Sequence, residues 1–237
     1  MIQNSFFYYL PSSSFFPIIC IIIFDAIFSF SSSHPPFSFL LLKISMEKRY
    51  TNDRGNDCLI SVDCVDHEIL EPWPYSRHWS RRWYSHKFKG PGLRYEVALS
   101  ILTGSICWIN GPFPCGVAND WQIFKNGLLL QLDEGERVEA DDGYAPGDPE
   151  FTKTPSGIYH REERNVIRRR VMARQETINK RNKQWGILSQ VYRHDIEKHQ
   201  SVFSAICVLT QITIDNGNPL FDTSEYTDYQ EEGGEWI

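Results

Sequence analysis

Four short apolar segments within the first half of the chain restrict its fold more than any other feature. They are residues 58–63, 84–89, 94–101 and 105–110. Segments of this length, rich in β-branched and aromatic residues and separated by turn residues such as Thr103-Gly104, are typical of strands. Four strands in so short a stretch predict an antiparallel meander, because hairpin turns leave no room for crossover helices.

Helical and strand patterns alternate after the meander. Asn119 or Asp120 is a candidate N-cap for a helix that continues to Leu132, and residues 137–141 predict another strand that ends in a carboxylate. Two longer helices are expected over residues 164–185 and 201–215. This order of strands, helix, strand and helices predicts an α/β fold in which helices pack on both faces of a mixed sheet.

The two ends of the chain differ from the part between them. Residues 1–45 carry only Asp25 and Lys43 as charges, and their longest apolar run is too short to span a membrane, which takes about 20 residues. We expect residues 1–45 to lie outside the fold, Met46 to be the functional start, and no stable membrane association. Residues 46–222 are expected to form one domain, followed by an acidic tail over residues 223–237.

The charge of the whole chain hides a local asymmetry. The 24 basic and 30 acidic residues give a net charge of −6, but residues 46–220 hold 23 of each sign. Between Arg161 and Arg193, ten basic residues stand against three acidic ones. The overall charge therefore does not exclude a nucleic-acid partner. The six cysteines form no C-x-x-C pair, which favours a reduced protein over a disulfide scaffold.

Three carboxylates stand where a metal site would need them. Asp63 and Asp141 close two predicted strands, and Glu176 lies on a helix that faces the sheet. Such oxygens suit Mg²⁺ or Mn²⁺, and two such ions activate water or a 3′-hydroxyl in phosphoryl transfer. The simpler alternatives are that each aspartate is a turn residue and that Glu176 forms helical ion pairs. Asp142 is an alternative to Asp141, because the two are adjacent.

Basic residues on the same helix could hold the phosphate groups of a nucleic acid. Each of them is equally explained as part of a solvated helix face. The candidates are Arg168, Arg169, Arg174, Lys180 and Lys183.

A series of motifs resembles the DDE endonuclease family of PIF/Harbinger-type transposases. The resemblance covers roughly residues 46–222, and the motifs occur in the family's order. They are WYSHKFKGPGLRYEV at 83–97, WINGPFPCG at 108–116, Asp120-x-x-Ile123-Phe124, VEADDGY at 138–144, ARQETINKR at 173–181, RHD at 193–195, and the stretch from LTQ at 209–211 to Phe221.

The resemblance implies an RNase H-like fold and a metal-dependent nuclease that cleaves DNA in the nucleus. It assigns Asp63 and Asp141 to the two catalytic aspartates and Glu176, in the pattern Arg-x-Glu-x-x-Asn, to the catalytic glutamate. Asp141 and Glu176 stand 35 positions apart, as the family leads one to expect. Asp120 matches a further aspartate often assigned to the metal site. The implied cofactor is Mg²⁺ or Mn²⁺.

The chain departs from the family pattern in three places, and two of these, the residues beside Asp63 and the missing upstream region, support a second hypothesis. Relatives usually read Asp-Gly-Thr starting at the first catalytic aspartate, whereas this chain reads Asp63-Cys64-Val65, and residues 77–82 resemble an insertion. Relatives also carry a helical DNA-binding region upstream, which residues 1–45 do not resemble. The alternative is a decayed transposon-derived protein that binds DNA or another protein without cutting. A separate DNA-binding partner protein would fit either hypothesis.

Overall fold

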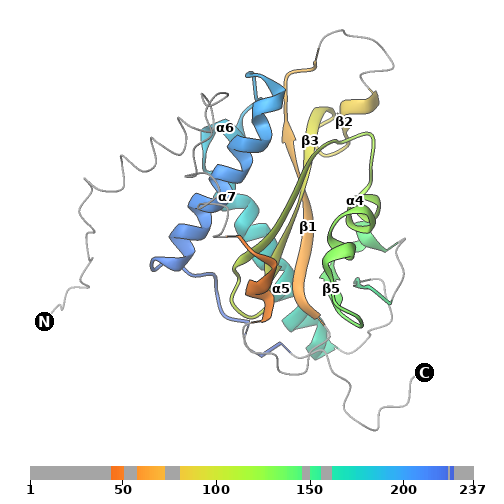
Figure 1. Cartoon of the computed structure of the whole chain (residues 1–237), viewed down its shortest axis with the longest axis vertical. Coiled ribbons are helices and arrows are strands. Elements are labelled where there is room, and N and C mark those ends of the chain that lie inside the picture. The colour runs from red at the N-terminus through yellow and green to blue at the C-terminus, as the bar shows by residue number, and fades with distance from the viewer. Residues whose placement is uncertain are drawn as a thin grey trace, which may run out of the picture.

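A computed structural model shows a mixed α/β fold, as the order of sequence patterns predicts (Figure 1). It describes residues 44–50, 58–72, 81–145, 150–155, 162–223 and 225–226. The strands are β1 (Cys58–Glu68), β2 (Tyr84–Ser85), β3 (Gly90–Ser100), β4 (Ile106–Pro114), β5 (Arg137–Ala140) and β6 (Thr152–Lys153). The α-helices are α4 (Asp120–Asn126), α5 (Glu162–Asn182), α6 (Gly186–Ser189) and α7 (His199–Asp215). The 3-10 helices are η1 (Met46–Tyr50), η2 (Leu128–Gln131), η3 (Asp142–Tyr144) and η4 (Ile196–Lys198).

The strands form one mixed sheet with β1 in its middle. The strand order is β2-β3-β1-β5-β6, and β4 pairs with β3 as well. β3 runs antiparallel to β1, β2 and β4, which confirms the antiparallel pairing of the predicted meander. Its predicted order is wrong for the second strand, because β1 pairs directly with β3 and β2 does not lie between them. β5 runs parallel to β1, and β6 runs parallel to β5. Parallel strands need a crossover connection, which the chain supplies with α4 and η2 between β4 and β5.

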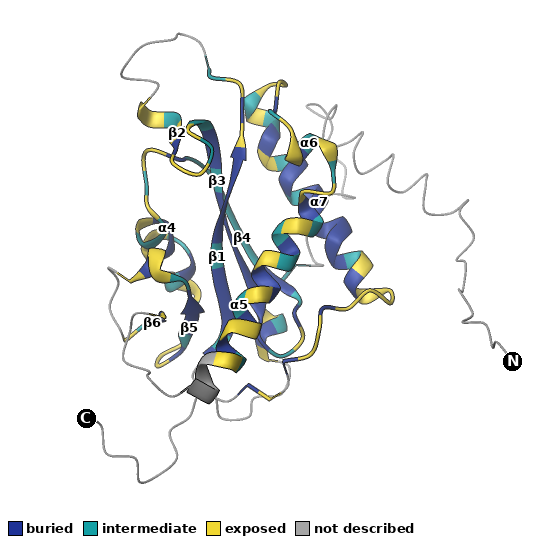
Figure 2. Ribbon diagram, turned by 180° about the vertical axis from the view of Figure 1, so that it is seen from behind, coloured by how far each residue is buried: buried dark blue, intermediate teal, exposed yellow. Residues whose placement is uncertain are grey.

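Helices cover both faces of this sheet (Figures 1 and 2). Alternate side chains of β1 point to opposite faces. On one face Val65 packs in a core with residues of α5, α6 and α7, including Ile178 and Phe203. On the other face Val62 packs with residues of α4 and η2, including Phe124. The central strands are therefore buried on both sides, which explains their nearly continuous apolar sequence.

β1 is longer than the sequence indicates. The prediction that it ends at Asp63 is wrong, because the strand continues to Glu68. Two polar residues beyond the predicted end, Asp66 and His67, are both only 2% exposed. Asp66 binds Arg94, and the Nδ1 atom of His67 lies 3.1 Å from the carbonyl oxygen of Leu188. Polar residues can therefore lie inside a buried strand when each has a hydrogen-bond partner.

The ends of two other strands also differ from prediction. The strand expected over residues 84–89 is reduced to Tyr84–Ser85, and β4 continues through the segment 111–114, which contains Pro112 and Pro114. β4 pairs only with β3 within the described sheet. A proline on such an edge strand leaves no ladder hydrogen bond unmade, so it does not end the strand.

The N-terminus of α4 places Asp120 firmly. Asn119 is the N-cap: its side chain accepts a hydrogen bond from the backbone N–H of Gln122 at 2.8 Å. The side chain of Gln122 accepts in turn from the Asn119 N–H at 3.0 Å, which completes a capping box. The helix ends at Asn126 rather than at Leu132, because Gly127 follows and the chain continues as the 3-10 helix η2.

The C-terminal boundary of the folded part lies beyond the predicted one. Thr223 and Tyr226, which we expected in a solvated tail, are 2% and 5% exposed. The Tyr226 hydroxyl donates to Glu139 on β5 at 2.8 Å, and Thr223 donates to the carbonyl oxygen of Ile101 at 2.6 Å. Residues 1–43 and 227–237, which hold most of the two predicted terminal segments, lie outside the described residues.

None of the described helices combines the length and apolar character needed to cross a membrane. α7, with 17 residues, is the most apolar long helix, and its apolar side chains pack against the sheet.

Candidate functional site

The register of the two central parallel strands brings Asp63 and Asp141 together. β1 and β5 are aligned so that Val62 lies opposite Ala140, which is the last residue of β5. Asp63 and Asp141 each follow this pair, at the edge where parallel strands present their carboxyl ends. In α/β sheets this edge is where ligands bind. Asp63 lies inside β1 rather than at its end. Because β5 ends at Ala140, Asp63 has no partner residue in the parallel strand beside it.

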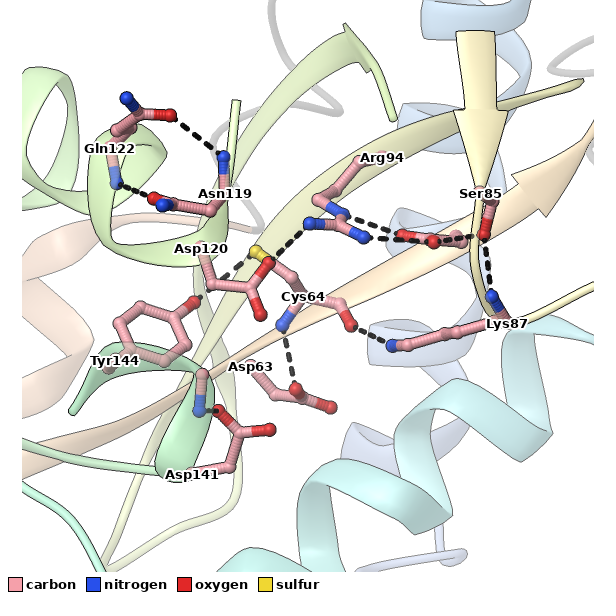
Figure 3. A network of polar contacts seen from close by, with 12 residues as sticks. Asp63, Cys64, Ser85, Lys87, Arg94, Asn119, Asp120, Gln122, Asp141 and Tyr144 are labelled. Carbon is pink, nitrogen blue, oxygen red and sulfur yellow. Dashed lines mark hydrogen bonds and ion pairs between the residues drawn. The ribbon is translucent and has the colours of Figure 1, made fainter. Parts of the chain in front are cut away.

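Asp120 enters the same place from the other side of the sheet. A Cβ atom built on Gly143 would lie 2.5 Å from Oδ2 of Asp120 and 2.9 Å from Oδ1 of Asp141. Both carboxylates therefore converge on the backbone of Gly143, and only a residue without a side chain fits there without displacing them. Figure 3 shows Asp63, Asp120 and Asp141 directed toward a common space, and we call these three residues the aspartate cluster.

The charges of the aspartate cluster oppose one another. Burial and the charges of Asp141 and Asp120 raise the pKa of Asp63 to about 6, although Lys87 and the Cys64 N–H act in the opposite direction. Burial and the charge of Asp120 also raise the pKa of Asp141. Ionised carboxylates at this site are therefore under-compensated, and perturbed pKa values of this kind concentrate at functional sites.

Hydrogen bonds from neighbouring groups fix the orientation of Asp63. Its Oδ1 accepts from the Cys64 N–H at 2.7 Å, and its Oδ2 accepts from Nδ2 of Asn179 on α5 at 3.1 Å. Gln175, one turn earlier on α5, donates to the carbonyl oxygen of Ser61 at 2.6 Å. The amide side chains of Gln175 and Asn179 thereby hold α5 against β1. Each carboxylate oxygen of Asp63 has one donor, the Cys64 N–H for Oδ1 and Asn179 for Oδ2.

Asp120 is held by a guanidinium that also neutralises a buried aspartate. Arg94 on β3 donates to Asp120 Oδ1 at 2.7 Å and to both oxygens of Asp66, at 2.7 Å and 3.0 Å. Ser85 donates to Asp66 at 2.6 Å. Burial alone would raise the pKa of Asp66, but the hydrogen bonds from Arg94 and Ser85 lower it overall. Arg94 leaves Oδ2 of Asp120 to face Gly143 and Asp141 (Figure 3).

Glu176 lies outside the aspartate cluster. It is exposed on α5, three residues before Asn179 and therefore on the neighbouring turn of the same face. Its charge, like that of Asp63, favours the charged form of Lys183. The structure thus brings three of the four predicted metal ligands together and leaves Glu176 beside them. Its role at a metal site remains a prediction.

Two of the five predicted phosphate contacts are structural. Arg168 is 9% exposed, forms an ion pair with Glu139, and donates to the carbonyl oxygens of Thr154, at 2.7 Å, and of Lys153. Arg174 is 3% exposed and donates to the carbonyl oxygens of Ile101 and Phe221. The prediction that they bind phosphates at the surface is wrong, because both guanidinium groups satisfy buried backbone oxygens.

The other three predicted phosphate contacts are exposed. They are Arg169, Lys180 and Lys183. Lys183 stands out among them, because it follows Asn179 by one helical turn and so lies near Asp63.

The geometry also separates Asp141 from Asp142. Asp141 precedes η3 as its N-cap, accepts a hydrogen bond from the Gly143 N–H at 2.9 Å, and interacts with Asp63. Asp142 is exposed. Asp141 is therefore the better candidate for a ligand, as the resemblance implied.

Residue patterns alone did not identify three neighbours of the aspartate cluster. They are Lys87, Arg94 and Asn179, and all three lie inside the motifs of the family resemblance. Their position in those motifs was the available signal. Only the structure shows that Lys87 donates to the carbonyl oxygen of Cys64 at 3.0 Å, beside Asp63.

The donor chemistry of the aspartate cluster fits a hard divalent ion. Among the described residues, no group of three or more His, Cys, Asp or Glu side chains is arranged so that it could hold a metal ion by itself. Mg²⁺ does not require such a group, because it keeps several of its waters and commonly takes one or two carboxylates together with substrate phosphates. The raised pKa values of Asp63 and Asp141 mark carboxylates that a cation would stabilise.

Comparison with known proteins identified no relative: no protein-family model, no curated protein and no solved structure matches the chain. The function must therefore be inferred from the arrangement of its residues and from the resemblance of its motifs.

Proposed function

We propose that this chain is a metal-dependent DNA endonuclease core of the DDE type, acting on phosphodiester bonds. The observation that carries the proposal is the aspartate cluster: Asp63, Asp120 and Asp141 come from three separate elements, and the charges of Asp141 and Asp120 add to burial in raising the pKa of Asp63. Arg94 pairs with Asp120 and with both oxygens of Asp66, whereas among the described residues Asp63 and Asp141 form no ion pair of this kind, as a purely structural pair of buried acids would be expected to do.

Each acidic residue has a distinct proposed role. Asp63 and Asp141 would hold or bridge the metal, Asp120 would assist them, and Glu176 would hold a second metal from α5. A divalent ion at this place activates a water or a 3′-hydroxyl and stabilises the leaving oxygen. The protein's own contribution is orientation: the Cys64 N–H and Asn179 fix Asp63, and Arg94 fixes Asp120.

The resemblance to PIF/Harbinger-type transposases extends this proposal to fold and context. The mixed sheet, its antiparallel meander and the helices on both faces support an RNase H-like arrangement. The target would be DNA in the nucleus, recognised with the help of a separate DNA-binding protein. The exposed basic residues of α5 support a polyanionic partner.

Nicking of supercoiled plasmid in Mg²⁺ or Mn²⁺ tests the proposal. We expect metal-dependent nicking by the wild-type chain and its reduction to the metal-free background in Asp63→Asn and Asp141→Asn. Asp142→Asn is the matched control, because it removes a neighbouring carboxylate that is exposed. Equal nicking by wild type and Asp63→Asn would exclude the assignment.

The second candidate function is binding without cleavage. Glu176 is exposed, and the described residues hold no group of three or more acids arranged to bind a metal, which favours a protein that lacks the complete catalytic set. Calorimetric titration with Mn²⁺ separates the two candidates. Binding that Asp141→Asn abolishes and Glu176→Gln weakens supports the nuclease, whereas the absence of any Mn²⁺ binding supports the alternative.

A further inference from the structure

Two lysines lie beside Asp63, and neither forms an ion pair with a described residue. The ion pairs among the described residues involve arginines, and neither Lys87 nor Lys183 takes part in one. Both side chains are exposed at the surface. Their ammonium groups are therefore in a position to meet a ligand that approaches the aspartate cluster.

Lys87 is fixed against the open edge of β1. It lies in the turn after β2, and its Nζ donates to the carbonyl oxygen of Cys64 at 3.0 Å (Figure 3). β5 ends opposite Val62, so the next residues of β1 have no parallel neighbour there. The N–H of Cys64 is taken by Asp63 and its carbonyl by Lys87. An ammonium group has three donors, so two remain for another acceptor.

Lys183 approaches the same section of β1 from the end of α5. Its N–H donates to the carbonyl oxygen of Asn179 at 3.0 Å, so the helical turn continues from the residue that binds Asp63. Partial burial and the charge of Lys87 lower its pKa, while Asp66, Glu176 and Asp63 oppose this effect. Lys183 therefore lies within electrostatic range of both Asp63 and Lys87, and an anion bound beside the two lysines would offset their mutual repulsion.

We propose that Lys87 and Lys183 form a seat for one phosphate group of a nucleic-acid strand beside Asp63. The inference rests on the proposed function, since it takes the aspartate cluster as the place where a strand is presented. It adds to that function the position of a phosphate beside Asp63, where the Nζ of Lys87 binds the carbonyl oxygen of Cys64. Carboxylates and ammonium groups both lie around Asp63, so a metal and a phosphate could be bound together.

Fluorescence anisotropy with a labelled single-stranded DNA tests the seat on the full-length chain in EDTA, where cleavage plays no part. Lys87→Gln and Lys183→Gln are each expected to weaken binding several-fold. Each should also lower the slope of log K against log salt by about 0.7, the value for one phosphate contact. Because both lysines hold the same phosphate, the double variant should lose little more than either single one.

The control is Lys125→Gln, an exposed lysine in the last turn of α4. Lys87→Arg should retain binding, and urea unfolding should show the same stability for all variants. Additive losses in the double variant, or losses no larger than that of Lys125→Gln, would overturn the proposal. Inorganic phosphate serves as a second probe: if it binds in a lysine-dependent way while DNA binding ignores both lysines, the seat takes a free anion and the proposal fails.

The outcomes separate this inference from the proposed function. DNA binding that depends on both lysines in a chain that never nicks would sustain the seat and refute the nuclease. Nicking that depends on Asp63 but is indifferent to both lysines would do the reverse.

Discussion

Asp63 and Asp66 lie three residues apart on the same strand, and their surroundings shift the pKa values of the two carboxyl groups in opposite directions. Asp66 faces Arg94 and Ser85, which lower its pKa despite its burial. Asp63 faces Asp120 and Asp141, and its pKa rises to about 6. The odd spacing places the two side chains on opposite faces of the sheet. One carboxylate is therefore an internal structural partner, and the other is charged at a cost to the fold.

This difference shows how a functional carboxylate can be distinguished from a structural one. A buried acid with a bidentate arginine has all the partners it needs. A buried acid among other acids lowers the stability of the fold when it is ionised. Such an arrangement is typical of sites that bind a cation. Three substitutions test this distinction, from the largest expected effect to the smallest.

Removing the charge of Asp66 should destabilise the protein most. In Asp66→Asn the guanidinium of Arg94 loses a buried ionic partner, and we expect a loss of about 3 kcal/mol in the free energy of unfolding. Urea denaturation at pH 7 measures it. Because the folded-state pKa of Asp66 is lowered, the same stability should also disappear in the wild type as the pH falls below 3.8.

Glu68→Gln is the control for Asp66→Asn, since Glu68 is an exposed acid at the end of the same strand. It should change the free energy of unfolding by less than about 0.5 kcal/mol. A similar small change in Asp66→Asn would mean that the Arg94 network is not structural.

Filling the space at Gly143 should disturb the aspartate cluster next. In Gly143→Ala the new Cβ would lie 2.5 Å from Asp120 Oδ2, so a carboxylate or the backbone must move. Such overpacking costs about 1–3 kcal/mol, and we expect Mn²⁺ affinity to fall with it. Differential scanning fluorimetry with and without Mn²⁺ measures both effects.

Gly186→Ala provides the comparison for Gly143→Ala. A Cβ there meets nothing closer than 3.9 Å, so the substitution should be neutral or slightly stabilising. If both alanine variants bind Mn²⁺ like the wild type, the convergence of Asp120 and Asp141 on Gly143 has no part in metal binding.

Neutralising Asp63 should have the smallest effect, with the opposite sign. The folded-state pKa of about 6 lies above the ordinary 3.8, so the wild type loses stability as the pH rises through this window. A pKa raised from 3.8 to about 6 costs the wild type at most about 3 kcal/mol at pH 7. Asn cannot ionise but accepts the hydrogen bonds of the Cys64 N–H and Asn179 less well, so metal-free Asp63→Asn should be more stable than the wild type by about 1–2 kcal/mol at pH 7. The difference should vanish at pH 4 and below.

Urea denaturation at both pH values checks this prediction. A destabilised Asp63→Asn variant at pH 7 would show that Asp63, like Asp66, serves the fold. Addition of Mg²⁺ should stabilise the wild type and not the variant, because a ligand stabilises only the state that binds it.

Much of the fold could be predicted from local patterns, since periodicity and capping act over a few residues. The meander, the Asn119 cap and the helices α5 and α7 followed from such signals. The errors occurred where distant partners override local character. β1 passes through Asp66 because Arg94 neutralises it, and the folded part includes Tyr226 because Glu139 binds its hydroxyl.

The basic helix shows the same limit for the candidate site. The same helix carries three arginines of identical chemistry, and helical spacing does not reveal which of them faces the protein; they are Arg168, Arg169 and Arg174. Two of them bind internal carbonyl groups because α5 crosses β6 and the C-terminal segment there. Lys87 is the opposite case: it had no role in the residue pattern, and the end of β5 opposite Val62 gives it one.

The sequence by itself determined the α/β class, the meander and the identity of the acids Asp63, Asp120 and Asp141, because these depend on local residue patterns and motifs. The tertiary structure decided which acids meet, which arginines are internal, and that Asp63 and Asp66 have opposite environments. The physical reason is that the pKa of a buried carboxylate depends on the charges within a few ångströms of it, and strand register brings those charges together from distant parts of the chain.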